Sequence, residues 1–154
     1  MNILNLKDNP QHLPTLASWH HAEWSHLNPE GSLEDRIKKM SVYLSDDQIP
    51  STFIYVGQNQ LIGSAAVIEH DMDTHKELSP WLASVYVKPE FRNQGIGSKL
   101  VSHIMQYINH AGFAELYLFT EDQVSFYSHL GWISVSEETY RNADVTIMKT
   151  TIKD

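Results

Sequence analysis

The sequence predicts a single mixed α/β domain, built on a mixed, mostly antiparallel central sheet that is flanked by helices. The length of 154 residues suits one ordinary domain, and 42% apolar residues with only 19% charged residues argue against a disordered chain. Segments with strand and helix periodicity alternate along the sequence. Hairpin signals towards both ends require antiparallel strand pairs, so we expect a mixed sheet rather than an all-parallel one. We expect residues 1–154 to form one domain.

The first elements are a short strand and two helices. Residues 3–6 are typical of a strand, and Pro10 or Pro14 can start the helix that follows, because proline is tolerated at the first helical position. One face of this helix gathers Leu13, Leu16, Ala17, His20, Trp24 and Leu27. Ser32 is a suitable N-cap for a second helix, whose apolar residues recur at helical spacing as far as Leu44.

A hairpin and a further strand come next. Residues 52–56 and 61–68 are rich in β-branched and apolar side chains, and residues 57–60 carry the turn signal between them. Residues 81–87 predict another strand. It ends before Pro89, because proline cannot donate to a strand ladder.

The second half predicts a long helix, a strand and a short helix. Apolar residues from Ile96 to Ile108 follow helical spacing, and residues 116–119 are typical of a buried strand. Thr120 and Gln123 have capping-box spacing for a helix that stops at Gly131.

Two strands, 132–135 and 144–148, close the chain. We expect strands 3–6 and 144–148 to form exposed edges of the sheet. Exposed edges can pair between chains, so the sequence is compatible with a monomer or a homodimer.

Composition excludes several classes of function. The chain has no cysteine, which removes disulfides, thiolate catalysis, zinc fingers and iron–sulfur clusters. A formal net charge of −8 argues against general nucleic-acid binding, which depends on lysine and arginine. The longest apolar runs fall far short of the roughly 20 residues that span a bilayer, and the first eight residues do not resemble a secretion signal. We therefore expect a cytoplasmic protein without a membrane partner.

The most specific motif is Arg92-Asn93-Gln94-Gly95-Ile96-Gly97, between a predicted strand and a predicted helix. Glycines there let backbone amides approach an anion, and the helix dipole favours phosphate. Arg92 can add a cationic contact. A tight turn that requires positive φ is the alternative interpretation. A dinucleotide fingerprint is incomplete because position 100 is Leu100, and the P-loop motif is absent.

A second motif lies about 30 residues further on. Phe126, Tyr127, Gly131 and Trp132 follow one more predicted strand. Together the two motifs resemble those of the GNAT superfamily of acetyl-CoA-dependent N-acetyltransferases. The phosphate-loop pattern Q/R-x-x-G-x-G/A is met in full, and the F-Y-x-x-x-G-F pattern has Trp132 in its last place. Thr120 stands where many members carry a cofactor-facing asparagine.

The resemblance implies a GNAT fold whose two central strands, 83–87 and 116–119, splay apart to receive the pantetheine arm of acetyl-CoA. Val85 and Val87 would pair with the arm through their backbone groups. The implied cofactor-binding residues are Val85, Tyr86, Val87, Arg92, Asn93, Gln94, Gly95, Ile96, Gly97, Ser98, Thr120 and Phe126. An amine of a small molecule or peptide would attack the thioester directly.

Direct attack requires a proton acceptor for the amine and a proton donor for the leaving thiolate. The resemblance implies Tyr127 as the donor, since a phenol with a pKa of about 10 is protonated at neutral pH. Glu69, beside His70 and Asp71 at a strand end, is the candidate base. A solvated loop carboxylate is an equal alternative for Glu69, and ordered water can replace a single base.

The cluster from Trp19 to His26 is rich in histidine but does not have metalloprotease spacing, so we expect no metal site. His20 lies on the apolar face and is typical of a core histidine. By analogy with the superfamily, Glu23 and Trp24 are candidate acceptor contacts. Residues 1–80 hold 11 acidic and 5 basic residues (net −6), against 8 and 6 (net −2) in residues 81–154. This asymmetry would attract a cationic amine, or it simply favours solubility.

Two other functions are compatible with these motifs. The first is a CoA-binding sensor or interaction module without turnover. The second is a dinucleotide-binding oxidoreductase, which the missing third glycine disfavours.

Overall fold

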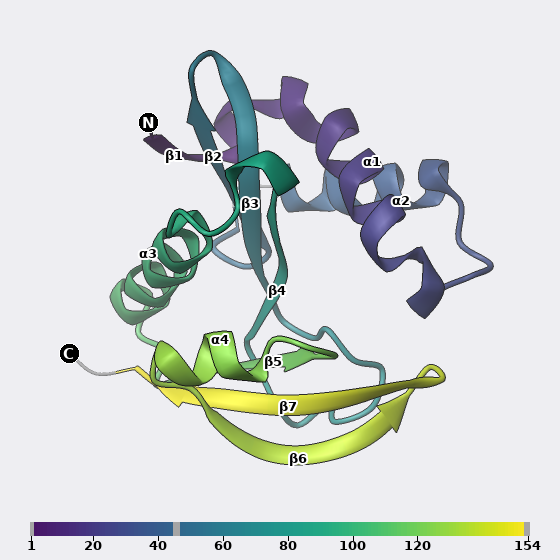
Figure 1. Ribbon diagram of the computed structural model, residues 1–154, viewed down its shortest axis with the longest axis vertical. Helices are drawn as coiled ribbons and strands as arrows, with labels where there is room; N and C mark the ends of the chain where they lie inside the picture. Colours follow the sequence, from purple (N-terminus) through teal and green to yellow (C-terminus); the bar gives the residue numbers. More distant parts are fainter. Residues whose placement is uncertain (1, 45–46, 153–154) are drawn as a thin grey trace.

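The computed structural model describes residues 2–44 and 47–152, which fold around one seven-stranded sheet with the strand order β1-β2-β3-β4-β5-β7-β6 (Figure 1). The strands are β1 (Asn2–Asn5), β2 (Ser51–Gly57), β3 (Gln60–Ile68), β4 (Trp81–Val87), β5 (Glu115–Thr120), β6 (Ile133–Tyr140) and β7 (Ala143–Thr151). The helices are α1 (Leu13–Trp24), α2 (Leu33–Ser41), α3 (Ile96–His110) and α4 (Val124–His129). Every pair of neighbouring strands is antiparallel except β4 and β5. The predicted mixed sheet is confirmed.

The helices start where local chemistry allows. Pro10 opens a short 3₁₀ turn, and α1 then begins at Leu13 with Pro14 in its first turn. The predicted N-cap of α2 is confirmed: the Ser32 hydroxyl accepts from the Asp35 amide at 3.0 Å, and the Asp35 carboxylate accepts from the Ser32 amide at 3.2 Å. These two bonds satisfy amides that the first turn of a helix leaves without an internal partner.

Two hairpins have short turns whose residues adopt left-handed backbone conformations. Gln58 and Asn59 join β2 to β3 with φ values of 52° and 61°, and Arg141 and Asn142 join β6 to β7 with φ values of 50° and 66°. Successive positive φ values are those of a type I′ turn, whose twist matches that of the flanking strands.

The two faces of β2–β4 are covered by different helices (Figure 1). Phe53, Leu82 and Leu100 belong to the core beneath α3. On the opposite face, Ile54 packs with Leu16 of α1 and Met40 of α2. Alternating side chains of one strand therefore supply both cores, as the period of two residues requires.

The helix α4 begins later than its capping signal suggested. The Thr120 hydroxyl accepts from the Gln123 amide at 3.0 Å, so Thr120 supports the turn before the helix, which itself starts at Val124. The helix stops before Gly131, whose φ is 96°.

The expected edge at 144–148 is wrong. β7 lies between β5 and β6, so within the described residues the edge strands of the sheet are β1 and β6. The second hairpin extends from Ile133 to Thr151, longer than predicted, and this length lets β7 pair fully with β5 while β6 takes the outer position. In the part of the chain that is described, no helix has the length and apolar character that a membrane crossing needs.

Two irregularities in β4 open the middle of the sheet. β4 and β5 share a single register pair, Trp81 with Tyr117, and then diverge. On its other side, β4 carries a bulge, because Ala65 of β3 faces both Ser84 and Val85 between the pairs Ser64–Tyr86 and Ala66–Ala83. Ser84 has a φ of 56°, in the left-handed region. The extra residue shifts the alternation of side chains between the two faces of β4 by one position. Val85 therefore packs with the α3 core and Tyr86 contacts α1.

Replacing Ser84 tests whether the bulge is a strained feature. Ser84→Gly should leave the free energy of unfolding unchanged or raise it by up to about 1 kcal/mol, because glycine adopts positive φ without a Cβ penalty. Ser84→Val should lower it by roughly 1–2 kcal/mol. The control is Ser102→Gly in the exposed middle of α3, which should lose about 0.5 kcal/mol. Chemical denaturation measures all three, and a loss in Ser84→Gly exceeding that of Ser102→Gly would contradict the assignment.

Candidate active site

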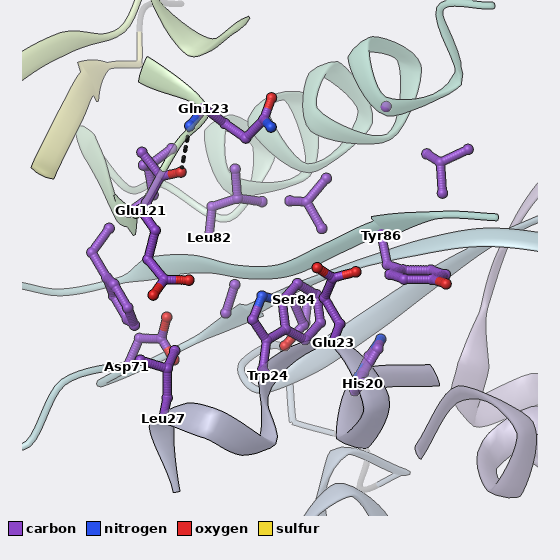
Figure 2. Close-up of a pocket in the computed structure, with 18 of the residues that line it drawn as sticks. His20, Glu23, Trp24, Leu27, Asp71, Leu82, Ser84, Tyr86, Glu121 and Gln123 are labelled. Atoms are coloured by element: carbon purple, nitrogen blue, oxygen red, sulfur yellow. Dashed lines mark hydrogen bonds between the residues drawn. The ribbon is translucent and has the colours of Figure 1, made fainter. Parts of the chain in front are cut away.

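A large cavity opens where β4 and β5 part. Its volume is about 810 Å³, and its walls come from both splayed strands, from α1 and α2, and from the loop that leads into α3. Figure 2 shows acidic and aromatic side chains of α1 and of the loops after β3 and β5 converging below β4. Most of the predicted site residues line this cavity: Glu23, Trp24, Val85, Tyr86, Val87, Arg92, Asn93, Gly95, Ile96, Gly97, Ser98, Thr120, Phe126 and Tyr127.

The glycine loop leads into α3 through left-handed backbone. Asn93 and Gly95 have φ values of 64° and 82°, and Gly95 is the N-cap residue. The first amides of a 15-residue helix follow, and such amides have no acceptor within the helix. A Cβ on Gly97 would lie 3.3 Å from the ring of Phe126 and 3.8 Å from Val87, so glycine keeps the first turn close to both. Gln94 belongs to the same loop but does not line the cavity.

The side chain of Arg92 turns towards α1. Its Nε donates to the Val87 carbonyl oxygen at 2.7 Å, and its guanidinium lies 5.4 Å from the centre of the Tyr86 ring. A terminal nitrogen is 3.8 Å from a carboxylate oxygen of Glu23 on α1. Arg92 therefore links the glycine loop to α1. The hydrogen-bond donors that the loop could offer to an anion are its backbone amides.

Tyr127 lies on α4, and its ring is buried. Its side chain is 7% exposed and packs edge-on against Phe126 and Trp132, with ring centres 4.9 Å and 5.9 Å away. Burial raises the pKa of its hydroxyl, which therefore holds its proton more firmly than a free phenol. Among the described residues its hydroxyl has no hydrogen-bond partner, so the proton is available to a group in the cavity.

Of the two carboxylates after β3, Asp71 lines the cavity and Glu69 does not. Glu69 follows β3 directly, is exposed, and does not line the cavity. Asp71, two residues later, does, and burial raises the pKa of its carboxyl to about 6, although the nearby charges of Lys39 and Arg141 lower it. Figure 2 shows the carboxylates of Asp71 and Glu121 facing each other across the cavity. Sequence reasoning missed Asp71 because a polar loop does not reveal which of its carboxylates turns inward.

The floor of the cavity beneath α1 and α2 is a row of small side chains. Thr52, Ala66 and Ala83 are register partners across β2, β3 and β4, so their side chains share one face of the sheet. All three line the cavity, because side chains this short leave space beneath α1 and α2. No sequence signal marks such a row, since register pairs the three residues only in the folded sheet.

The Thr52 hydroxyl is a buried polar group at the far end of this row. The residue is 1% exposed, and its Oγ1 has no hydrogen-bond partner among the described residues. A buried hydroxyl without a partner costs about 1–3 kcal/mol.

The neighbouring row is filled by His20. Its Nε2 lies 3.1 Å from the Ser64 hydroxyl, its ring is 2% exposed, and burial, aided by the charge of Arg36, lowers its pKa to about 3. The prediction of a core histidine is confirmed. No group of three potential metal ligands occurs among the described residues.

Polar contacts hold the segment after α1 across the cavity mouth. His26 Nε2 is 3.0 Å from an Oε atom of Glu121, which follows β5. Arg141, in the β6–β7 turn, donates to the Leu27 carbonyl oxygen at 3.4 Å and to the Asp73 carboxylate at 2.9 Å. The segment after α1 is therefore linked to the loop after β5 and to the β6–β7 turn at the rim of the cavity.

Comparison with known proteins agrees with this geometry. The family model for the acetyltransferase (GNAT) domain matches residues 50–134, which include β2 to α4 and both motifs. The chain belongs to the GNAT acetyltransferase family. Members of this family take their acetyl group from acetyl-CoA.

Relatives of this GNAT chain are distant in sequence. An uncharacterized N-acetyltransferase, ycf52, of Gracilaria tenuistipitata var. liui is 28% identical over 101 residues. That match includes 64% of this chain and 53% of the relative, so the chain spans about half the length of the curated relative that it matches.

Solved structures share the fold over the full length. An aminoglycoside 6′-N-acetyltransferase in complex with coenzyme A is 18% identical, with a TM-score of 0.76 over 100% of this chain and 98% of the other. A ribosomal-protein-alanine N-acetyltransferase from Brucella melitensis is 16% identical, with a TM-score of 0.74 over 98% and 99%. At this identity the likeness concerns the GNAT fold alone.

Proposed function

We propose that this protein transfers an acetyl group from acetyl-CoA to an amine of a small molecule or peptide by direct attack. One observation carries the proposal: β4 and β5 part after one register pair, and a buried phenol and a half-buried carboxylate line the cavity that results. The first group can give a proton and the second can accept one. Direct transfer needs both at once.

Two parts of the cavity wall suit acetyl-CoA, the acetyl donor. The amides at the start of α3 suit a pyrophosphate, because they carry the positive end of the helix dipole. Among the described residues, β4 beyond Trp81 has no strand partner on its β5 side, so the backbone of Val85 is open to an extended amide-containing arm. The Val87 carbonyl oxygen already accepts from Arg92 Nε, so an arm that pairs at Val87 would share or replace this bond. Phe126 and Thr120 line the same part of the cavity.

Proton transfer accompanies acetyl transfer. Asp71 takes a proton from the ammonium group of the acceptor, directly or through water. The freed nitrogen forms a bond to the acetyl carbonyl carbon while the carbon–sulfur bond breaks. Tyr127 donates its proton to the departing sulfur, and the second proton of the new amide nitrogen leaves to solvent. Tyr127 regains a proton from solvent and Asp71 releases its own, so the products are the amide, the thiol of CoA and one proton. Moving a proton from an amine of pKa about 10 to a carboxyl of pKa about 6 costs about 5 kcal/mol, well below the roughly 13–17 kcal/mol barrier of ordinary turnover.

The related structures do not select the acceptor. One acts on an aminoglycoside by name and another on the alanine of a ribosomal protein, so a shared fold accommodates both small and macromolecular amines. The acceptor must therefore be inferred from the residues that line this chain's own cavity.

The pH profile tests Asp71 as the base. kcat/KM should fall as the pH drops below about 6, because the raised pKa of Asp71 means that the carboxylate is lost there. Asp71→Asn should lower kcat/KM at pH 7.5 by about 10²-fold or more and remove this acid limb. Glu69→Gln is the matched control and should retain both. An acid limb that persists in Asp71→Asn would exclude Asp71 as the base.

Tyr127→Phe tests the proton donor. Removing the hydroxyl should lower kcat by about 10²-fold while the dissociation constant of acetyl-CoA stays within about twofold. Thiol release measures kcat, and calorimetry measures binding. Tyr107→Phe, whose hydroxyl donates to the Gln48 carbonyl oxygen outside the cavity, is the control. If wild type binds acetyl-CoA but releases no thiol with any amine, the protein is a sensor and not a transferase.

Ser98→Asp tests the glycine loop as an anion site. Ser98 lies in the first turn of α3, where a carboxylate favours the helix but repels a pyrophosphate. The dissociation constant of CoA should rise about tenfold without a fall in the melting temperature. Ser102→Asp, one turn further along and exposed, should leave affinity unchanged. Equal affinity in both variants would mean that the loop is only a turn.

A further inference from the structure

The acceptor side of the cavity extends well beyond the place where the chemistry occurs. Its floor runs from Ala83 on β4 through Ala66 to Thr52 on β2. Neighbouring strands lie about 4.8 Å apart, so the far end is about 10 Å from β4. The His20–Ser64 pair closes the adjacent row and gives this extension a definite side wall.

The far end of this extension carries hydrogen-bonding and positive groups. The Thr52 hydroxyl is buried, lines the cavity and lacks a partner among the described residues. Arg36 and Lys39 of α2 line the same cavity, and within the described residues Lys39 forms no ion pair. Arg36 is close enough for its charge to act on His20.

Acidic side chains also line the cavity, and Glu121 is paired with His26. Asp71 and Glu121 come from the loops after β3 and β5, and their carboxylates face each other (Figure 2). An ammonium group is held best between such carboxylates, whereas the α2 end suits an anion. The charge of Lys39 reaches Asp71 and lowers the pKa of its carboxyl, so the same cavity presents a cationic and an anionic group to one acceptor.

We infer that the acceptor carries a carboxylate in addition to its reacting amine, with the two groups several bonds apart, and that this carboxylate docks between Thr52 and Lys39. An ω-amino acid and a short peptide share this chemistry. The inference rests on the proposed N-acetyltransferase function and names its substrate class. A simple diamine leaves the Thr52 end without a partner, and a free α-amino acid is too short to reach from there to the splayed strands.

Matched acceptors test the carboxylate. With acetyl-CoA, kcat/KM from thiol release should be at least tenfold higher for 6-aminohexanoate than for its methyl ester, cadaverine or glycine. Glycylglycine against 6-aminohexanoate separates a peptide from an ω-amino acid as the preferred source, and glycinamide is the control without a carboxylate. Calorimetric binding of the same compounds to the CoA-saturated protein gives a second readout that needs no turnover.

Two variants locate the subsite. Lys39→Gln and Thr52→Val should each reduce the preference for acid over ester at least threefold, in turnover and in binding. Thr52→Val keeps the side-chain shape and removes an unpartnered hydroxyl, so its melting temperature should not fall. Lys38→Gln, the exposed neighbour that does not line the cavity, should keep the full preference.

The outcomes separate this inference from the function on which it rests. Equal turnover and binding of acid and ester overturn the inference alone, as does a preference that survives in both Lys39→Gln and Thr52→Val. Absence of thiol release with every amine overturns the transferase, while selective binding of the acids would still support the carboxylate subsite.

Discussion

The structure depends on one interruption of hydrogen bonding in the middle of the sheet. Strands normally satisfy their backbone groups on both sides, yet β4 has one register pair with β5 and then leaves it. The unpaired edges face a cavity rather than bulk protein, which is the condition under which unpaired backbone is tolerated. A ligand with an extended amide backbone restores what the sheet lacks. The longer pairing of β5 with β7 and of β4 with β3 keeps the two halves rigid around the gap.

The bulge at Ser84 and the loop at Gly95 both line the cavity in which we propose that the donor binds. Both use left-handed backbone, one in a serine and one in a glycine. The loop could be found from the sequence because glycine at a strand-to-helix turn has a known physical use. The bulge could not, because serine is common in strands and its conformation follows from the register of β3 against β4.

Most elements could be predicted because helix and strand periodicities were undisturbed between Thr52 and Leu130. The position of β7 was mistaken, since the order of strands in a sheet depends on pairing between distant segments. The same limit applies to the site. Tyr127 and the glycine loop belong to contiguous motifs, whereas Asp71 and Thr52 reach the cavity through a loop conformation and a strand register. Glu69 was favoured on strand geometry that ends one residue before it, at Ile68.

The row Thr52–Ala66–Ala83 has a consequence for how such an enzyme diverges. The depth of the cavity is fixed by the side-chain size at one register position on each of three strands, none of which belongs to the transfer machinery. A branched residue in place of Ala66 would close the extension and leave the donor site intact. Acceptor length is therefore an independent variable of this scaffold, open to change by single substitutions that leave the reaction itself untouched.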